Sequence, residues 1–543
     1  MLKRILTIIL STALILSMFA GCVKVQNSNP PPVNKQNDDD VTKTSNSNTP
    51  TVPDAKNYGD TGGLVLPIVD KPITLSYMVT ANITDANEKP IIKELEKRTG
   101  IKLDIIGIPA ASYAEKLKIT MASGKLPDIF HGATSSEQKQ LGAQGILTPV
   151  NKHIDKLPNF KKLYVEENPW VLKSWSDDNG DIYTWPVYGV SRDVNHGFLY
   201  RKDIFDKNNI KQWTNTEEFY QALRKLKEIY PDSTPYVSKT QDNIFRDWAY
   251  GWGMSVYDYP MYYDETSKLW KFAFVQPEFK EMITFMKKLH DEGLLDPEFL
   301  TDTQASWTAK MTQDDKAFVT FDWIGRLDMF TNQLKEQLPD YDLRYANPVG
   351  SVGKIRRLNK IDSWGIVVPK NANSEIALKL LDYLTSPSGA TLITMGIEGE
   401  HFTFDANNKP VYPGLKDLEK VEITVLEKEY GCWLQGMYVR TDPRSAYYNY
   451  TEREQEAQDL MVKSERILEL DPILKFTDTE SASKAELTDP LLKAGLEFAS
   501  RFVLNKSYGE NEWNDWLKKA ETLQYEKLEE IYQGAQKRYD SAN

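Results

Sequence analysis

Hydrophobic and polar positions in the N-terminal part of the chain follow the pattern of a parallel α/β unit. Ile73–Val79 (ITLSYMV) is a β-branched and aromatic run, which is typical of a strand. The next segment places Ile91, Ile92 and Leu95 on one helical face and ends at Gly100, a residue type that often terminates helices. A second strand-like run (IKLDIIGIP), a second helical segment and LPDIFHG follow. This order predicts right-handed crossovers and a parallel sheet.

The second helical segment and two later stretches carry local signals. Ser112 and Glu115 have the spacing of a capping box, and Gly124 marks the expected helix end. Asp177–Asp181 (DDNGD) is expected to form a tight turn. GFLYRKDIFDK predicts a strand that leads directly into a helix.

Farther along, apolar residues recur at helical spacing and then return to short strands. KAFVTFDWIGR and SWGIVVPK predict strands that stand apart from their sheet neighbours, and helical segments dominate the end of the chain (YEKLEEIYQGAQKRYDSAN). A chain that builds an α/β lobe, leaves it and returns favours two lobes joined by crossing strands. The expected buried helix faces consist of Phe219, Leu223 and Leu226 in one helix, and Phe279, Met282, Ile283, Met286 and Leu289 in another.

The first residues have the pattern of an export signal. MLKR is positively charged, and ILTIILSTALILSMFA is apolar but shorter than the ~20 residues that a membrane-spanning helix needs. The ending FAGC resembles a bacterial lipobox, although Phe19 occupies a position where Leu is usual. We therefore expect residues 1–21 to be a signal peptide and Cys22 to carry lipid. The alternative is an ordinary signal peptide followed by an incidental cysteine.

The second cysteine and the segment behind Cys22 fit this interpretation. If Cys22 is acylated, only Cys432 remains and no disulfide can form within the chain. Cys432 stands among large apolar residues (YGCWLQG), which favours a small buried side chain over a reactive thiol. Residues 22–63 are rich in Asn, Pro, Asp, Ser and Thr, so we expect a tether that spans ~35 Å. The protein would then lie on the outer face of the cytoplasmic membrane.

Composition excludes some partners and leaves others open. The chain has 66 Lys and Arg against 78 Asp and Glu, a net charge of −12, which disfavours nucleic acid. Its length corresponds to ~3 domains, although two large lobes fit as well. The five histidines are widely scattered, so no metal-ligand spacing is present, and we expect no metal and no cofactor.

Seven segments, in this order, resemble the extracellular solute-binding lipoproteins of ABC carbohydrate importers, the group that includes maltose-binding protein. The resemblance runs from about Leu64 to the end and is closest to the long lipoprotein branch of Gram-positive bacteria. No single segment is specific, but their order and spacing together are. The segments are TGIKLDIIGIP, YAEKLKITMASGKLPDIF, LYRKDIFDKNNI, KAFVTFDW, SWGIVVPK, MGIEGEHF and LEEIYQGAQKRYD.

The resemblance implies an α/β, two-lobed periplasmic-binding-protein-like (class II) fold with discontinuous lobes joined by crossing strands. Lobe one would comprise residues 64–195 and 316–361, and lobe two residues 196–315 and 362–543. Hinges would lie near Asn195, Lys316 and Asp362. It also implies a monomer that captures a sugar, closes over it and delivers it to the permease subunits of an ABC transporter.

Candidate ligand-binding residues follow from this topology. Sugars present hydroxyl edges to polar side chains and C–H faces to aromatic rings, and open α/β sheets bind ligands at strand carboxyl ends. Thr80, Asn82, His131 and Thr134 follow strands of lobe one. Glu398, His401 and Trp433 are implied by the resemblance alone. The remaining candidates are Asn195, Trp252, Tyr257, Asp322, Trp323, Arg326 and Trp364.

Three of the tryptophans have competing structural interpretations. Trp323 follows a crossing strand, where relatives often carry a sugar-stacking Trp, but core packing would also bury it. Trp252, in YGWGMSVYDYP, suits an aromatic cleft wall or packing within a lobe. Trp364 opens a returning strand, where hinge packing is an equal alternative.

The main rival function is a membrane-anchored polysaccharide hydrolase or lyase, which would need a carboxylate pair in an aromatic cleft. Asp291, Glu292 and Asp296 are instead typical of a solvated helix end, and the sequence contains no HExxH, GxSxG, CxxC or P-loop motif. We therefore expect no catalytic residue. A peptide or siderophore receptor and a surface adhesin remain as further alternatives.

Overall fold

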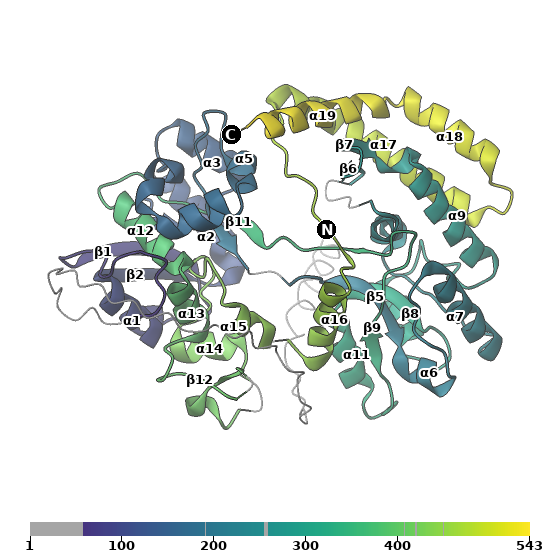
Figure 1. Ribbon diagram of the computed structural model, residues 1–543, viewed down its shortest axis with the longest axis horizontal. Helices are drawn as coiled ribbons and strands as arrows, with labels where there is room; N and C mark the ends of the chain where they lie inside the picture. Colours follow the sequence, from purple (N-terminus) through teal and green to yellow (C-terminus); the bar gives the residue numbers. More distant parts are fainter. Residues whose placement is uncertain are drawn as a thin grey trace, which may run out of the picture.

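The computed structural model describes residues 58–542, except 190–191, 255–258, 407, 419–420 and 449 and the side chains of 446–448. Figure 1 shows two α/β lobes side by side, with the first part of the chain in one and the C-terminal helices over the other. Each lobe has its own large hydrophobic core. The predictions for the signal peptide, Cys22, residues 22–57 of the tether and Tyr257 lie outside the described residues.

The sheet of lobe one forms as the sequence pattern predicts. Strand β1 (Ile73–Thr80) pairs in parallel with β2 (Ile101–Ile108) from Ile73↔Ile101 to Thr80↔Ile108. It also pairs in parallel with β3 (Ile129–Phe130), giving the order β2-β1-β3. Two crossover helices, α1 (Pro90–Thr99) and α2 (Ala110–Ser123), connect these strands.

The helix ends are predicted with mixed success. Gly100 and Gly124 are the left-handed C-caps of α1 and α2, as expected. The prediction of a capping box at Ser112 and Glu115 is wrong, because Pro109 is the N-cap of α2 and Ser112 lies inside the first turn of the helix. The Ser112 hydroxyl donates to the Pro109 carbonyl instead, at 3.2 Å.

Two further strands complete the lobe-one sheet near the passages between the lobes. Strand β4 (Trp185–Tyr188) pairs antiparallel with β11 (Ile361–Ile366), and a bridge between Phe130 and Val367 connects this pair to β3.

The other elements of this lobe, with η marking 3₁₀ and π turns, are η1 (Ala86–Glu88), α3 (Ser135–Ala143), η2 (Val150–Lys156), α4 (Pro158–Phe160), η3 (Lys161–Glu166), α5 (Trp170–Trp175), α12 (Ser374–Thr385), α13 (Pro387–Met395), β12 (Thr403–Phe404), β13 (Pro410–Val411), η7 (Pro413–Leu415), α14 (Ile423–Tyr430) and α15 (Pro443–Tyr448).

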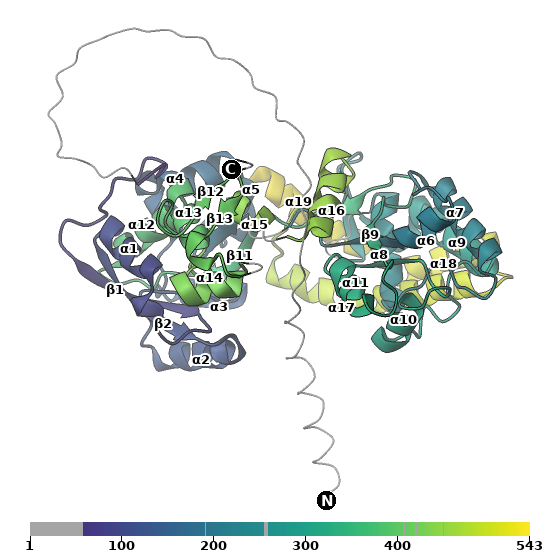
Figure 2. The ribbon, with the colours of Figure 1, turned by 90° about the horizontal axis from the view of Figure 1, so that it is seen from below.

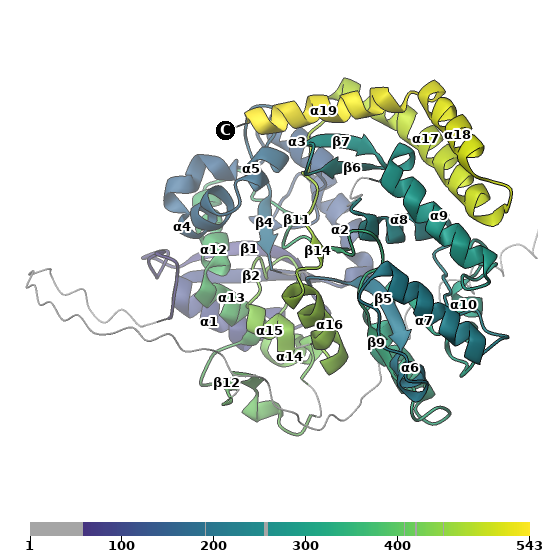
Figure 3. The ribbon, with the colours of Figure 1, turned by 45° about the vertical axis from the view of Figure 1, so that its right-hand side comes forward.

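Lobe two is built around an antiparallel sheet in the order β8-β5-β9. Figure 3 shows α17, α18 and α19 as an outer layer over α9 and the β6–β7 hairpin. The elements are β5 (His196–Arg201), α6 (Lys202–Lys207), α7 (Thr216–Ile229), η4 (Gln241–Asn243), α8 (Ile244–Ala249), η5 (Tyr250–Trp252), β6 (Met261–Asp264), β7 (Leu269–Phe272), η6 (Ala273–Val275), α9 (Pro277–Asp291), α10 (Gln304–Met311), β8 (Val319–Trp323), α11 (Arg326–Leu334), β9 (Leu343–Tyr345), β10 (Ile355–Arg356), α16 (Glu452–Lys463), β14 (Ile467–Leu468), α17 (Asp478–Leu504), α18 (Glu510–Thr522) and α19 (Tyr525–Ser541).

The amphipathic helices of lobe two bury the faces that their sequences predict. All the expected core residues of α7 and α9 are fully buried, because their 3–4 spacing places them on one side of each helix. GFLYRKDIFDK forms β5 followed directly by α6, as expected. Cys432 is fully buried in the core of lobe one, and this burial raises the pKa of its thiol.

The segments that make up each lobe differ from the expected boundaries. Residues 316–361 were expected in lobe one, but β8 pairs with β5, so most of this segment belongs to lobe two. Residues 362–543 were expected in lobe two, but residues up to Val439 pack in the core of lobe one. The physical reason is strand pairing. β8 and β9 pair with β5 within one continuous stretch of lobe two, whereas β4 of lobe one takes its partner β11 from beyond that stretch.

The chain passes between the two cores in three places. These lie between Val187 and Val194, between Ile355 and Ile361, and between Val439 and Ala457. The first two adjoin Asn195 and Asp362, where hinges were expected, whereas Lys316 lies within lobe two; hinge motion at the first two remains a prediction. The first two passages are hydrogen-bonded together, since Leu358 N–H donates to the Asp193 carbonyl at 3.0 Å. Figure 2 shows the lobes on either side of these passages, with α15 and α16 on opposite sides of the junction.

Candidate functional site

Polar side chains gather where the parallel strands of lobe one end. Thr80 ends β1 and His131 follows β3, and the Thr80 hydroxyl lies 3.1 Å from His131 Nε2. Tyr113, from α2, stacks on the His131 ring at 4.1 Å. Burial lowers the pKa of His131 to about 4, so the ring is neutral near pH 7. This pair therefore offers hydrogen bonding without charge.

An aromatic group lies beside this pair. The N–H of Gly132 donates to the Trp364 carbonyl at 2.7 Å, which fixes the end of β11 against the loop after β3. The Trp364 ring contacts Tyr438 edge-on at 5.1 Å, and Trp433 contacts the same Tyr438 at 5.0 Å. All three rings are partly exposed, and the buried Trp433 Nε1 has no hydrogen-bond partner among the described residues.

The segment that carries Trp433 and Tyr438 is attached to the end of β1. Thr80 and Gln435 exchange backbone hydrogen bonds of 3.0 and 3.2 Å, and the Gln435 side chain is exposed. At Gly436, φ is +96° and an added Cβ would lie 2.3 Å from the His131 ring. Only glycine permits this approach. Sequence reasoning missed Gln435 and Tyr438, because nothing local links them to β1.

Two other predicted residues of lobe one, Asn82 and Thr134, make hydrogen bonds that stabilise the lobe itself. The exposed Asn82 donates its backbone N–H to Glu427 at 2.8 Å. Thr134 is the N-cap of α3, in a capping box with Glu137. Its hydroxyl is engaged there, so it contributes little free hydrogen-bonding capacity.

On lobe two, the paired ends of β5 and β8 carry the principal predicted aromatic residue. Trp323 is directly opposite His196 in the strand register, and its Nε1 donates to the Asn195 side chain at 3.1 Å. The ring lies over Gly325, where an added Cβ would come within 2.3 Å of it. Trp323 is only partly buried, which keeps part of the ring accessible.

Asp322 lies beside Trp323 and is held between two cations. Its carboxylate is 2.9 Å from Lys239 Nζ and 2.8 Å from Arg326 Nε. Both cations also lie over the ring of the buried Trp307, at 4.4 and 5.2 Å. Asp322 is 4% exposed, so its carboxylate is hardly accessible to a ligand. Its role is to hold the two cations in position.

A second charged group adjoins Asp322. Desolvation by the surrounding protein lowers the pKa of His196; Asp322 acts to raise it, whereas Lys239, Arg246 and Arg356 lower it further. Arg246 Nη2 is 3.5 Å from Asp247, and its buried Nε has no hydrogen-bond partner among the described residues. Burial raises the pKa of Asp247 to about 6. These cations come from separate elements and follow no motif, so sequence reasoning did not find them.

Three predicted residues lie away from these two groups. Trp252 is 1% exposed and stacks on Trp248 at 6.1 Å, so packing within the lobe describes it, not a cleft wall. His401 stacks on Tyr430 at 4.2 Å in a separate part of lobe one. Glu398 lies in the exposed turn before His401.

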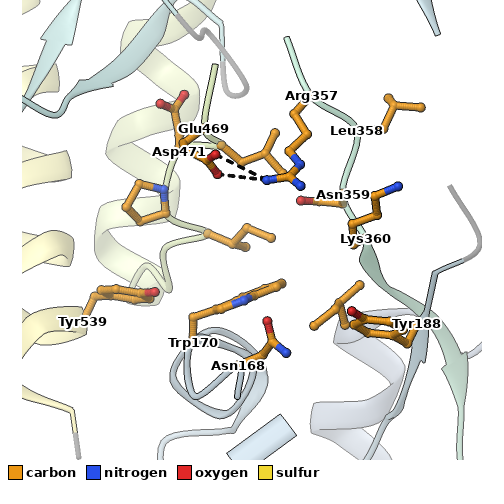
Figure 4. Close-up of a pocket in the computed structure, with 14 residues that line it drawn as sticks. Asn168, Trp170, Tyr188, Arg357, Leu358, Asn359, Lys360, Glu469, Asp471 and Tyr539 are labelled. Carbon is orange, nitrogen blue, oxygen red and sulfur yellow. Dashed lines mark hydrogen bonds and ion pairs between the residues drawn. The ribbon is translucent and has the colours of Figure 1, made fainter. Parts of the chain in front are cut away.

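A cavity of ≈ 410 Å³ lies at the junction of the two lobes, and none of the predicted residues lines it. Lobe one contributes Trp170 and Tyr188, and the C-terminal helix of lobe two contributes Tyr539. Figure 4 shows the Trp170 ring across the floor, with Arg357 above it, 3.3 Å from Glu469. The positive charge of Arg356 lowers the pKa of His196, whereas the next residue, Arg357, lines this cavity. Successive residues of an extended segment point to opposite sides, so we infer that the cavity and the His196 group lie on different faces of the passage.

Residues 80–391 match the family model described as bacterial extracellular solute-binding protein. The chain belongs to this family. This solute-binding protein is 26% identical over 376 residues to the fructooligosaccharide ABC transporter substrate-binding protein FusA of Streptococcus pneumoniae, covering 65% of this chain and 68% of FusA. It is 24% identical over 483 residues to lipoprotein LipO of Bacillus subtilis, covering 83% and 90% of the two chains.

Solved structures agree with the fold of this solute-binding protein. The HMO-binding, ABC-transporter-associated solute-binding protein of Bifidobacterium longum infantis aligns with a TM-score of 0.62 at 18% identity, covering 87% of this chain and 99% of that one. The fold class is therefore the expected two-lobed, periplasmic-binding-protein-like one.

No described helix is both long and apolar enough to cross a membrane. Within the described residues, no three His, Cys, Asp or Glu side chains are grouped so that they could hold a metal ion.

The DDNGD segment forms the expected tight turn, in which Asp177 accepts the N–H groups of Asn179 and Asp181 at 2.8 and 2.9 Å.

Proposed function

We propose that this protein captures an oligosaccharide between its lobes and delivers it, chemically unchanged, to the permease of an ABC importer. The observation that carries the proposal is the pair of partly exposed aromatic groups at the ends of the two sheets. Trp364, Trp433 and Tyr438 lie on lobe one, and Trp323 lies on lobe two. Sheet ends of this kind are where open α/β folds bind ligands.

The chemistry of both groups suits a sugar. Aromatic rings cover the apolar C–H faces of pyranose rings, at about 25 cal/mol per Å² of apolar surface removed from water. The neutral pair of Thr80 and His131, the exposed Gln435 and the Asn195 amide can meet hydroxyl groups. Thr80, His131, Asn195, Trp323, Trp364 and Trp433 therefore remain the proposed ligand-binding residues, joined by Gln435 and Tyr438.

Relatives support the same ligand class and cellular position. FusA is named for fructooligosaccharide and the Bifidobacterium protein for HMO binding, and LipO is named a lipoprotein. We propose that Cys22 is acylated and that the segment behind it tethers a monomeric protein to the outer face of the membrane. A protein anchored in this way would share the membrane that holds its permease.

The test combines binding, shape and ligand recovery. A thermal-shift screen across oligosaccharides should identify a ligand, since one present at 100 times its dissociation constant stabilises the protein by ~2.7 kcal/mol. Small-angle scattering should then show a smaller radius of gyration with that ligand, because the lobes close. The ligand should be recovered intact. More than one equivalent of cleaved product per protein would contradict the proposal and favour a hydrolase or lyase.

A further inference from the structure

The charges beside Trp323 point to the class of sugar. Four charged side chains have the strongest influence on the pKa of His196. Three of them are cations, namely Lys239, Arg246 and Arg356, and the fourth is the anion Asp322. This is a local excess of positive charge in a chain whose net charge is −12. A neutral sugar would gain little from such an excess, because cations at a protein surface chiefly attract anions.

Asp322 cannot neutralise this excess by itself. One carboxylate is shared by Lys239, at 2.9 Å, and Arg326, at 2.8 Å. One carboxylate therefore faces two cationic side chains, so Asp322 does not fully balance their positive charge. The two cations also lie over Trp307, which holds them close to the end of β8.

Arg246 has hydrogen-bonding capacity that the described protein does not use. Among the described residues, its ion pair with Asp247 is long at 3.5 Å, and its side chain is 42% exposed. Its Nε is buried and lacks a partner among the described residues. A guanidinium binds a carboxylate through two parallel hydrogen bonds, so an Arg in this condition suits an incoming carboxylate.

The opposite side of the site does not repel such a ligand. The polar groups at the ends of β1 and β3 are the neutral Thr80 and His131. Two carboxylates in this region are engaged within the protein: Glu427, 8% exposed, accepts the N–H of Asn82, and Glu137 accepts the N–H and hydroxyl of Thr134.

We propose that the captured oligosaccharide is acidic, built from uronic-acid units. Arg246 receives a sugar carboxylate, aided by the positive charge of Lys239 and Arg326 around Asp322, while a ring of the same ligand stacks on Trp323. This inference rests on the proposed sugar-binding function and narrows it.

The experiment compares each acidic ligand with its own neutral form. Titration calorimetry would use trimers and tetramers of galacturonic, mannuronic, guluronic and glucuronic acid, each beside the same oligosaccharide after chemical reduction of its carboxyl groups. We expect at least one acidic ligand to bind at least tenfold more tightly than its reduced form, with a preference that weakens as salt is raised.

Variants then assign the carboxylate to Arg246. Arg246→Gln should weaken acidic binding by about 10- to 150-fold, the range for hydrogen bonds to charged groups, and leave the reduced ligand unchanged. Arg246→Lys should restore part of the loss. Arg501→Gln is the matched control, because Arg501 is a 64% exposed arginine on α17 that pairs with Glu497 on the same helix.

The outcomes separate this inference from the function it rests on. Equal affinity for acidic and reduced ligands, with both weakened by Trp323→Ala, would overturn the acidic assignment and leave sugar capture in place. Tight binding of sulfated oligosaccharides without any binding of uronic acids would also overturn it. Failure of every saccharide to bind would overturn both proposals together.

Discussion

Replacing Trp323 by alanine tests whether the paired ends of β5 and β8 form the ligand site. The ring is partly exposed, lies over Gly325 and donates one hydrogen bond to Asn195. Removing it takes away the surface on which a sugar face would stack, worth ~1.5–3 kcal/mol if a full aromatic face is covered. Affinity for the ligand should fall by roughly 10- to 150-fold at 1.4 kcal/mol per decade.

The same substitution should affect stability much less than loss of a core tryptophan. One net hydrogen bond is worth ~0.5–1.5 kcal/mol, and the partly exposed ring adds less than a fully packed one. Trp252 provides the matched control, since it is 1% exposed and stacked on Trp248 in the same lobe. Trp252→Ala should cost ~3–5 kcal/mol of stability while the protein that remains folded binds with unchanged affinity.

Titration calorimetry and thermal melting of both variants decide the matter. Each kcal/mol should shift the melting temperature by ~2–4 °C for a lobe of this size, so the two variants are readily separated. A large fall in melting temperature for Trp323→Ala, with affinity unchanged in the folded protein, would return Trp323 to the core and refute the reasoning.

Three further predictions concern the cysteines and the buried histidine. Wild-type protein should incorporate labelled fatty acid and partition with membranes, and Cys22→Ser should do neither; equal labelling of both would rule out lipidation at this cysteine. In the Cys22→Ser protein, Cys432 is the sole thiol and should resist an alkylating reagent until denaturant is added, because burial raises its pKa. Burial lowers the pKa of His131 from 6.5 to about 4, so the unfolded chain takes up a proton in this window that the folded protein does not. The unfolding free energy of wild type relative to His131→Gln should therefore drop by ~3 kcal/mol as pH falls from 6.5 to 4, at about 1.4 kcal/mol per pKa unit, and a constant difference would contradict the assignment.

Sequence patterns predicted local structure well and non-local pairing poorly. The periodicity of α7 and α9 fixed which side chains are buried, and glycines marked the ends of α1 and α2. The lobe to which β8 belongs could not be predicted in this way, because its partner β5 lies more than 100 residues earlier. Strand pairing of this kind depends on tertiary context, which a period-2 pattern does not contain.

The candidate site shows the same division. Thr80, His131 and Trp323 were found because strand ends are readable in sequence, and the structure places each at the end of a sheet strand. Lys239 and Arg246 come from the segments before and within α8, and Tyr438 comes from an irregular segment after α14. Only the folded chain brings them to these strand ends, so no spacing between them could have signalled their role.

The three passages between the cores have a consequence for how the chain can acquire its structure during synthesis. The core of lobe one draws on residues from Leu75 to Val439, and the core of lobe two on residues from Val194 to Tyr532. A chain made from its N-terminus offers β4 of lobe one its partner β11 only after most of lobe two has emerged. Lobe one can then complete its core before the three C-terminal helices α17, α18 and α19 exist. A growing chain would therefore hold two half-built cores at once, and we expect a fusion or truncation placed near Ile361 to leave both lobes incomplete.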